Sequence, residues 1–163
     1  MKTLLATLSL LCSTTAFGQV IDGTLDAEYG APNTVQNTQT GFGNSDIGMP
    51  DFANGSEIDA AHVRIANGYL YIMLPGNLES VFNKLDIFID ARSGGQHTLR
   101  ADNPDIDFDG LNRMGDDGTG NGLTFDVGFE ADMWIGMTCG GDTFATYANY
   151  AELPTEGAGY GEY

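Results

Sequence analysis

The chain has 163 residues, of which 23 are acidic and 6 are basic, and its formal net charge is −17. A field of this sign repels nucleic acid and anionic membrane surfaces, which excludes both as expected partners. The two cysteines, Cys12 and Cys139, exclude a scaffold held together by several disulfides.

The N-terminal segment, residues 1–18, has the pattern of a secretory signal peptide. Lys2 precedes an apolar run over residues 4–12, and the small residues Ala16 and Gly18 stand where a signal peptidase cuts. We expect cleavage after Gly18, with cleavage after Ala16 as the second choice. The run is too short to cross a bilayer, so we predict a secreted protein that is extracellular or held at the cell surface.

The remaining residues, 19–163, suit a single domain with its own core. Only Cys139 is left in this part, so no intrachain disulfide is expected. We predict that Cys139 is buried as a small hydrophobic residue, with pairing to another chain as the alternative.

Four elements are predicted before the middle of the chain. Residues 20–21 begin a strand, residues 25–29 form a short helical turn, residues 34–40 form a polar edge strand, and residues 41–55 form a long loop.

Residues 58–74 predict a β-hairpin whose turn is Asn67-Gly68, because both central residues of a type I′ turn need positive φ. Counting outward from the turn pairs Ala66 with Tyr69, and the register follows. Alternation then gives a wholly apolar face, the predicted core face, made of Ala61, Val63, Ile65, Leu70, Ile72 and Leu74. The opposite face carries His62, Arg64, Tyr69, Tyr71 and Met73.

A third strand is predicted over residues 84–90, after a short helical turn within residues 78–83. Its expected inward residues are Leu85, Ile87 and Ile89, and its expected outward residues are Asp86, Phe88 and Asp90.

The second half of the chain begins with a predicted loop over residues 93–121 and a strand over residues 123–127. A second hairpin is predicted from residues 132–138 and 143–150 around Gly140-Gly141, with Trp134 opposite Tyr147.

Roughly seven strands, almost no helix and turn-rich connections indicate an all-β fold, an antiparallel β-sandwich of the jelly-roll or immunoglobulin-like kind. Beyond Leu153 the chain is rich in glycine and shows no closing strand. We therefore expect a sandwich that is incomplete at its C-terminus.

Three blocks carry a resemblance: Ile21-Asp22-Gly23-x-Leu25-Asp26, Tyr69-Leu70-Tyr71-Ile72 and Leu85-Asp86-Ile87-Phe88-Ile89-Asp90. Together they resemble the opening of the family 9 carbohydrate-binding module and related DOMON-like β-sandwiches. With Asn83-Lys84-Leu85, Ser93-Gly94-Gly95-Gln96 and the run over residues 110–117, the mature chain also resembles uncharacterised exported bacterial proteins, many with a C-terminal sorting tail. The resemblance implies sugar binding by aromatic side chains, a fold often braced by calcium, and a longer natural chain.

An acidic loop is the sharpest candidate metal site. Asp105, Asp107, Asp109 and Asp116 occupy positions 1, 3, 5 and 12 of a calcium loop of the EF-hand type, with Gly110 at position 6. The last ligand is Asp in place of Glu, and no helices are predicted on either side. Carboxylates two residues apart repel one another, and Ca²⁺ would remove that repulsion. The alternative is a solvent-exposed strand with Ile106 and Phe108 inward.

The second face of the first hairpin offers a candidate glycan site. Arg64, Tyr69, Tyr71 and Phe88 combine flat aromatic groups with a hydrogen-bonding residue, which suits sugar rings, and Trp134 in the second hairpin invites the same interpretation. The alternative is that this face is buried inside a two-sheet stack.

These observations predict a non-catalytic surface or extracellular-matrix protein that binds glycan or assembles with copies of itself. With only His62 and His97, no common hydrolase or nucleotide-binding motif is present. The alternative is a glycoside hydrolase-like enzyme that uses paired carboxylates, but no particular pair stands out.

Overall fold

The computed structural model describes residues 20–37, 56–107 and 110–163. Most of the described chain is strand or irregular connection, with a 3₁₀ turn η1 at Ala27–Tyr29 and a single-turn helix α1 at Gly110–Arg113. The strands are β1 Thr34–Val35, β2 Glu57–Ile58, β3 Ala60–Ala66, β4 Tyr69–Met73, β5 Gly76–Asn77, β6 Val81–Ile89, β7 Met133–Gly140, β8 Ala145–Glu152 and β9 Gly161–Glu162. The predicted signal peptide and the loop over residues 41–55 lie outside the described residues.

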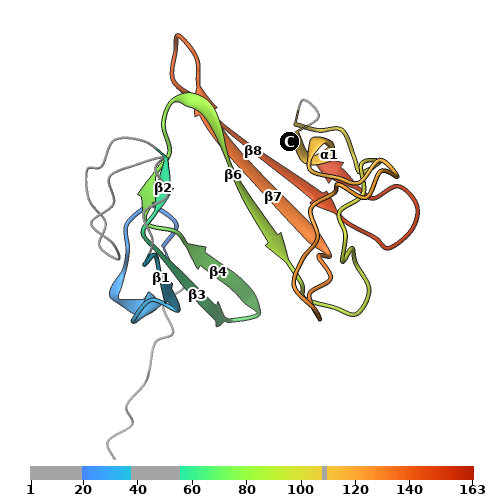
Figure 1. Cartoon of the computed structure of the whole chain (residues 1–163). Helices are drawn as coiled ribbons and strands as arrows, with labels where there is room; N and C mark the ends of the chain where they lie inside the picture. Colours follow the sequence, from blue (N-terminus) through green and yellow to red (C-terminus); the bar gives the residue numbers. More distant parts are fainter. Residues whose placement is uncertain (1–19, 38–55, 108–109) are drawn as a thin grey trace, which may run out of the picture.

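All strand pairs are antiparallel, so the predicted all-β antiparallel class is confirmed. The strand orders are β1-β3-β4, β2-β5 and β6-β7-β8-β9. Figure 1 shows the two small sheets on one side of the molecule and the four-stranded sheet on the other. In the part of the chain that the structure describes, no helix has the length and apolar character needed to span a membrane.

The turn between β3 and β4 is the one that the sequence predicts. Asn67 and Gly68 have φ angles of 52° and 82°, as a type I′ turn requires. The register follows: Ala66 pairs with Tyr69, Arg64 with Tyr71, and His62 with Met73. A turn of two residues leaves the strands no freedom to slip.

Several other predicted elements differ from the observed ones. Residues 78–83 contain no helical turn, since β6 begins at Val81. Residues 20–21 form no strand, and residues 123–127 contribute only an isolated bridge between Thr98 and Thr124. The short turn near Tyr29 and the second hairpin are confirmed.

The register of the second hairpin differs from the prediction. Trp134 pairs with Ala151, and Tyr147 pairs with Thr138. The reason is the connection: β7 continues to Gly140, which pairs directly with Ala145, so a four-residue turn separates the strands. The register of a hairpin depends on its loop length, and the Gly140-Gly141 pair does not determine that length.

The core lies on one face of the four-stranded sheet. Phe88, Trp134 and Ala151 form a cross-strand row on this face, from β6 to β8. The cover consists of residues 96–107 and 110–131, including α1, followed by Leu153 after β8. The buried cluster is Leu99, Leu111, Ala131, Trp134, Ala151 and Leu153, with Phe88, Ile106, Met114, Phe125 and Phe129 packed against it.

A buried polar network fastens this cover. The side-chain amide of Gln96, 3% exposed, donates to Asn103 Oδ1 at 2.7 Å and to the Pro154 carbonyl at 3.0 Å. Gln96 Oε1 accepts from the Arg100 amide at 2.9 Å. These bonds compensate for the desolvation of the amide groups and tie the loop to the segment that follows β8.

The prediction that the apolar hairpin face is core is wrong. Ile65 is 78% exposed, Leu70 is 46% exposed and Val63 is 42% exposed, whereas His62 on the opposite face is 4% exposed. The physical reason is the position of η1, which packs on the His62 face and buries Tyr29 there. Among the described residues no layer buries the apolar face.

The inward and outward sides predicted for residues 84–90 also need correction. Phe88 packs against the buried cluster, and Asp86 accepts a hydrogen bond from Trp134 Nε1 at 2.9 Å. The supposedly outward residues therefore point to the covered face, because the cover packs on their side of β6. Leu85, Ile87 and Ile89 are half-buried on the other face.

The position of the core leads to a paired stability prediction. Leu111→Ala should lower the free energy of unfolding by about 2–5 kcal/mol, as for other fully buried leucines. Ile65→Ala should cost less than about 1 kcal/mol, because most of its surface is already in water. Urea denaturation followed by tryptophan fluorescence measures both values. Equal losses would show that the hairpin face is packed as core after all.

Candidate functional site

The polar face of the β3–β4 hairpin brings together three of the five predicted glycan-binding residues. Arg64 pairs with Tyr71, and Tyr69 lies two positions before Tyr71 on the same face. The two tyrosine rings meet edge to face, with centroids 6.4 Å apart and an interplanar angle of 60°. Tyr69 is 67% exposed and Tyr71 is half-buried, so part of the aromatic pair is open to solvent.

The guanidinium of Arg64 is held in place by η1. Its Nη1 donates to the carbonyl oxygen of Glu28, and a guanidinium has five N–H groups in a fixed plane. On the same face, Tyr29 contacts the buried His62 edge to face with centroids 6.3 Å apart. The contacts with η1 therefore orient the arginine beside Tyr71 and leave further donors for a ligand.

Phe88 and Trp134 do not belong to this surface, and their placement there is wrong. Trp134 is 0% exposed, and Phe88 packs with it in the covered core of the four-stranded sheet. The indole lies over Gly136, where a Cβ would overlap the ring. Glycine at this position allows the indole to lie flat on the sheet, out of reach of any glycan.

A partly buried ion pair joins β6 to the segment that covers the same core. Lys84 Nζ contacts Asp107 Oδ2 at 2.6 Å and donates to the Asp107 carbonyl at 2.7 Å. Both carboxylate oxygens of Asp107 also accept from the Leu111 amide, at 3.1 and 3.0 Å. A Cβ at residue 110 would overlap the ion pair, so Gly110 is needed for this close approach.

The predicted calcium ligands have different environments. Asp105 is exposed, Asp107 is paired with Lys84, and Asp109 lies outside the described residues. Asp116 Oδ1 accepts from the amides of Gly118 and Gly120 at 2.9 and 2.8 Å. Within residues 20–37, 56–107 and 110–163, no three metal-ligating side chains are grouped as a cation site requires. Calcium binding stays a prediction.

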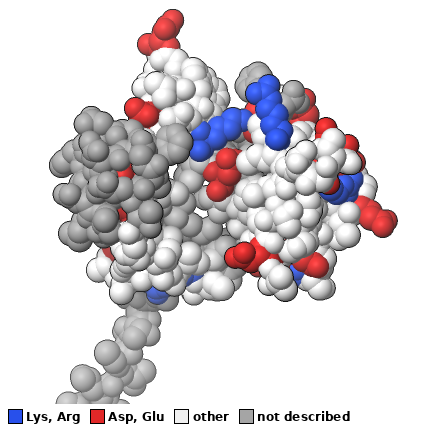
Figure 2. All heavy atoms as spheres, viewed as in Figure 1, with Lys and Arg blue, Asp and Glu red and all other residues white. Residues whose placement is uncertain are grey.

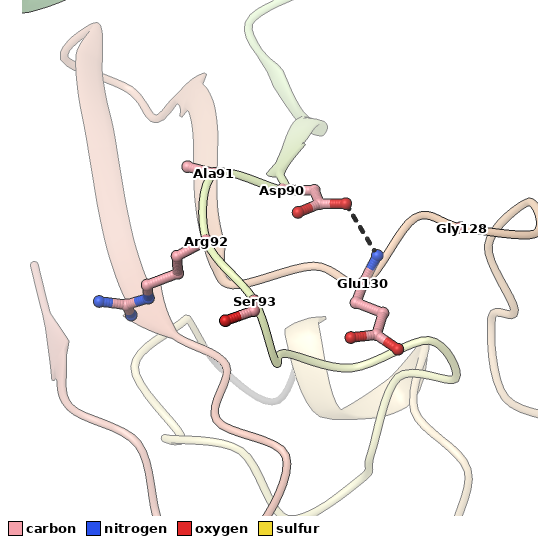
Figure 3. A pocket seen from close by; sticks show the side chains of 6 residues that line it. All are labelled: Asp90, Ala91, Arg92, Ser93, Gly128 and Glu130. Carbon is pink, nitrogen blue, oxygen red and sulfur yellow. Dashed lines mark hydrogen bonds between the residues drawn. The ribbon is translucent and has the colours of Figure 1, made fainter.

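A depression at the end of β6 has a volume of about 430 Å³. Figure 3 shows the Asp90 carboxylate pointing toward the backbone nitrogen of Glu130, while the Glu130 carboxylate and the Arg92 guanidinium point away from it. The Glu130 amide donates to Asp90 Oδ2 at 3.2 Å, and buried Asp132 accepts from the Ala91 and Arg92 amides at 2.7 and 2.8 Å. These bonds are internal ties of the loop, and exposed carboxylates alone indicate no ligand.

On the face drawn in Figure 2, acidic side chains are dispersed over the surface, with a few basic side chains among them. A dispersed negative field opposes anionic ligands without marking one point of the surface as a cation site.

No family model, curated protein or solved structure matches this chain. The resemblance to carbohydrate-binding and DOMON-like sandwiches therefore stays a prediction, and a functional assignment depends on the geometry of the chain itself.

The thiol of Cys139 is free and 4% exposed, as the preferred prediction for it states. It donates to the carbonyls of Leu78 and Glu79 at 3.5 and 3.4 Å. Its burial beside the β5–β6 connection indicates a structural role.

Sequence reasoning missed one exposed aromatic pair, Phe82 and Tyr147, on the four-stranded sheet. Their centroids are 6.5 Å apart. Tyr147 is visible in the alternating pattern of the second hairpin, but nothing in the sequence indicates that Phe82 adopts a positive φ. The pair is therefore found only in the structure.

The environment of Asp86 gives a pH prediction. Burial raises the pKa of Asp86 above its ordinary value, and the Trp134 hydrogen bond and the charge of Lys84 offset part of that rise. A group whose pKa is raised in the folded state stabilises the fold at pH values below its pKa in the unfolded chain. This contribution to the unfolding free energy is lost as the pH rises through the pKa of the folded state. Asp86→Asn should remove this pH-dependent decrease in the unfolding free energy, because asparagine does not ionise. Its amide oxygen still offers an acceptor for Trp134 Nε1.

Urea titrations across the acidic pH range measure this effect as the change in unfolding free energy with pH. Asp102→Asn is the matched control, because its hydrogen bond with Arg100 lowers the pKa of Asp102 and the sign is opposite. An unchanged pH slope in Asp86→Asn would contradict the account.

Proposed function

We propose that this chain is an exported, non-catalytic glycan-binding protein that uses the polar face of its β3–β4 hairpin. The observation that carries the proposal is the exposed edge-to-face pair of Tyr69 and Tyr71 beside the anchored guanidinium of Arg64. The sequence resemblance to carbohydrate-binding modules supports the same ligand class, and the proposal assigns no catalytic step.

The chemistry of this face suits a sugar. The C–H surface of a pyranose is apolar and packs on an aromatic ring, while its hydroxyls need donors and acceptors at the rim. Tyr69 and Tyr71 offer ring surface and phenol groups, and Arg64 offers donors. The rings have few rotatable bonds, so ordering them costs little entropy.

The aromatic pair makes this proposal testable. Tyr69→Ala and Tyr71→Ala should each weaken binding of a glycan found on a broad array by at least about tenfold, because aromatic anchors typically dominate such interfaces. Isothermal titration calorimetry of the mature protein measures the affinity. Tyr163→Ala is the matched control, since Tyr163 is 89% exposed and lies outside the hairpin.

The proposal fails if the wild-type protein binds no glycan on the array, or if the two hairpin variants bind as tightly as the control. Circular dichroism of each variant separates loss of binding from loss of fold.

Self-association is a second candidate, because the other face of the same hairpin is apolar and exposed. Val63, Ile65 and Leu70 gather there, and β4 is an outer strand of its sheet. Exposed apolar faces and open strand edges are common contacts between copies. The strong net negative charge opposes association, so added salt should favour it.

Sedimentation velocity over a range of protein concentrations tests this second function. The wild-type protein should form larger species as concentration and salt rise, and Ile65→Glu should abolish them because a charge on the contact face must be desolvated. Val127→Glu is the control, since Val127 is 100% exposed and lies far along the chain from the hairpin. A wild-type monomer at every concentration would contradict self-association.

A further inference from the structure

A second aromatic surface is built on a bulge in β6. The register between β6 and β7 shifts between Val81 and Lys84, so Phe82 and Asn83 share one step of the ladder. Phe82 has a φ of 64°, a left-handed conformation that is strained for a non-glycine residue. Such strain persists only where the surrounding structure holds it, and here it turns the Phe82 ring onto the sheet.

The Phe82 ring packs against the backbone of Gly140 on the neighbouring strand, where no side chain stands in its way. Gly140 lies directly below it, and a Cβ at residue 140 would come within 2.9 Å of three ring carbons. Because Gly140 alternates with Thr138 along β7, the ring lies on the face that carries Thr138 and, across β8, Tyr147.

Tyr147 completes this surface. Its ring centroid is 6.5 Å from that of Phe82, and the two planes are inclined by only 34°. Phe82 is 54% exposed and Tyr147 is 49% exposed. The two rings are therefore neighbours that are tilted relative to one another, and both residues are partly open to solvent.

Polar groups border the rings on the same face. Lys84, Thr138 and Tyr147 form one cross-strand row, and Asn149 lies two residues farther along β8. The Lys84 ammonium is already neutralised by Asp107 at 2.6 Å, so it supplies no free positive charge for an anion. The net charge of −17 opposes anionic ligands as well. Apolar ring faces with uncharged hydrogen-bonding neighbours match an uncharged saccharide.

We propose that Phe82 and Tyr147 form a second, separate binding surface for an uncharged saccharide, with Thr138 and Asn149 contacting its hydroxyls. This surface shares no residue with the hairpin face of Tyr69 and Tyr71. Two surfaces on different sheets make the protein bivalent toward a polymeric saccharide. Binding at one surface raises the effective concentration of the polymer at the other, so the avidity exceeds the affinity of either surface alone.

The experiment uses the mature protein and a panel of uncharged hexaoses, namely cellohexaose, maltohexaose, xylohexaose and N-acetylated chitohexaose, titrated by calorimetry. Three variants perturb the surface differently. Phe82→Gly removes the ring and also relieves the positive φ, Tyr147→Ala removes the second ring, and Gly140→Ala pushes the Phe82 ring aside. Each should weaken binding of at least one hexaose by tenfold or more.

Phe144→Ala is the matched control, because Phe144 is 67% exposed in the turn of the same hairpin and is not in the Phe82–Tyr147 ring contact. It should bind like the wild type. The melting temperature of Phe82→Gly should lie within a few degrees of the wild-type value or above it. A loss of binding in this variant will then not reflect unfolding.

Tyr69→Ala separates the two sites. If it abolishes all hexaose binding while Phe82→Gly changes nothing, the second surface is wrong and the hairpin proposal stands. If only Phe82→Gly and Tyr147→Ala reduce binding, the hairpin proposal is wrong and the second surface stands. A wild type that binds none of the four hexaoses, or a Phe82→Gly variant whose only effect is to disperse oligomers, overturns the inference, the latter in favour of a second copy as the occupant.

Discussion

The ion pair between Lys84 and Asp107 joins the four-stranded sheet to the irregular segment that covers it. Lys84 belongs to the sheet, whereas Asp107 belongs to the cover and also accepts a hydrogen bond from the Leu111 amide in α1. The cover has little regular structure of its own, so a few specific contacts must position it. Because Leu111 and Trp134 are buried only when the cover is in place, this pair and the Gln96 network hold the hydrophobic core closed.

The two sides of the β3–β4 hairpin illustrate how a small element can serve two roles. One side is packed by η1 and presents ordered aromatic and guanidinium groups, which are suited to directional recognition. The other side is apolar and open, which suits a nonspecific contact with another surface. A hairpin alone is only marginally stable in water, and the contacts of Tyr29 and Glu28 with β3 give this one its support.

The sequence predicts local features well because their causes are local. The Asn67-Gly68 turn determines a register that needs no information from elsewhere, and the buried Cys139 follows from the general behaviour of free thiols. The buried face of a strand is a different matter, since it depends on what packs against it. Nothing in the alternation of residues 60–74 reveals that η1 covers His62. Nothing in the alternation of residues 84–90 reveals that residues 96–107 and 110–131 cover Phe88. The proposed surfaces divide in the same way. The hairpin register predicts that Arg64, Tyr69 and Tyr71 share one face, whereas the burial of Trp134 and Phe88 depends on the cover. The positive φ of Phe82 has no sequence signature.

The thiol of Cys139 gives this protein a built-in chemical reporter. Its sulfur is covered by the β5–β6 connection and bonded to two carbonyls of that connection. A thiol reagent can reach it only when this segment moves away from β7, so the rate of labelling would follow local opening beside Phe82 and not global unfolding alone. The same burial also shields the Cys139 thiol from oxidants.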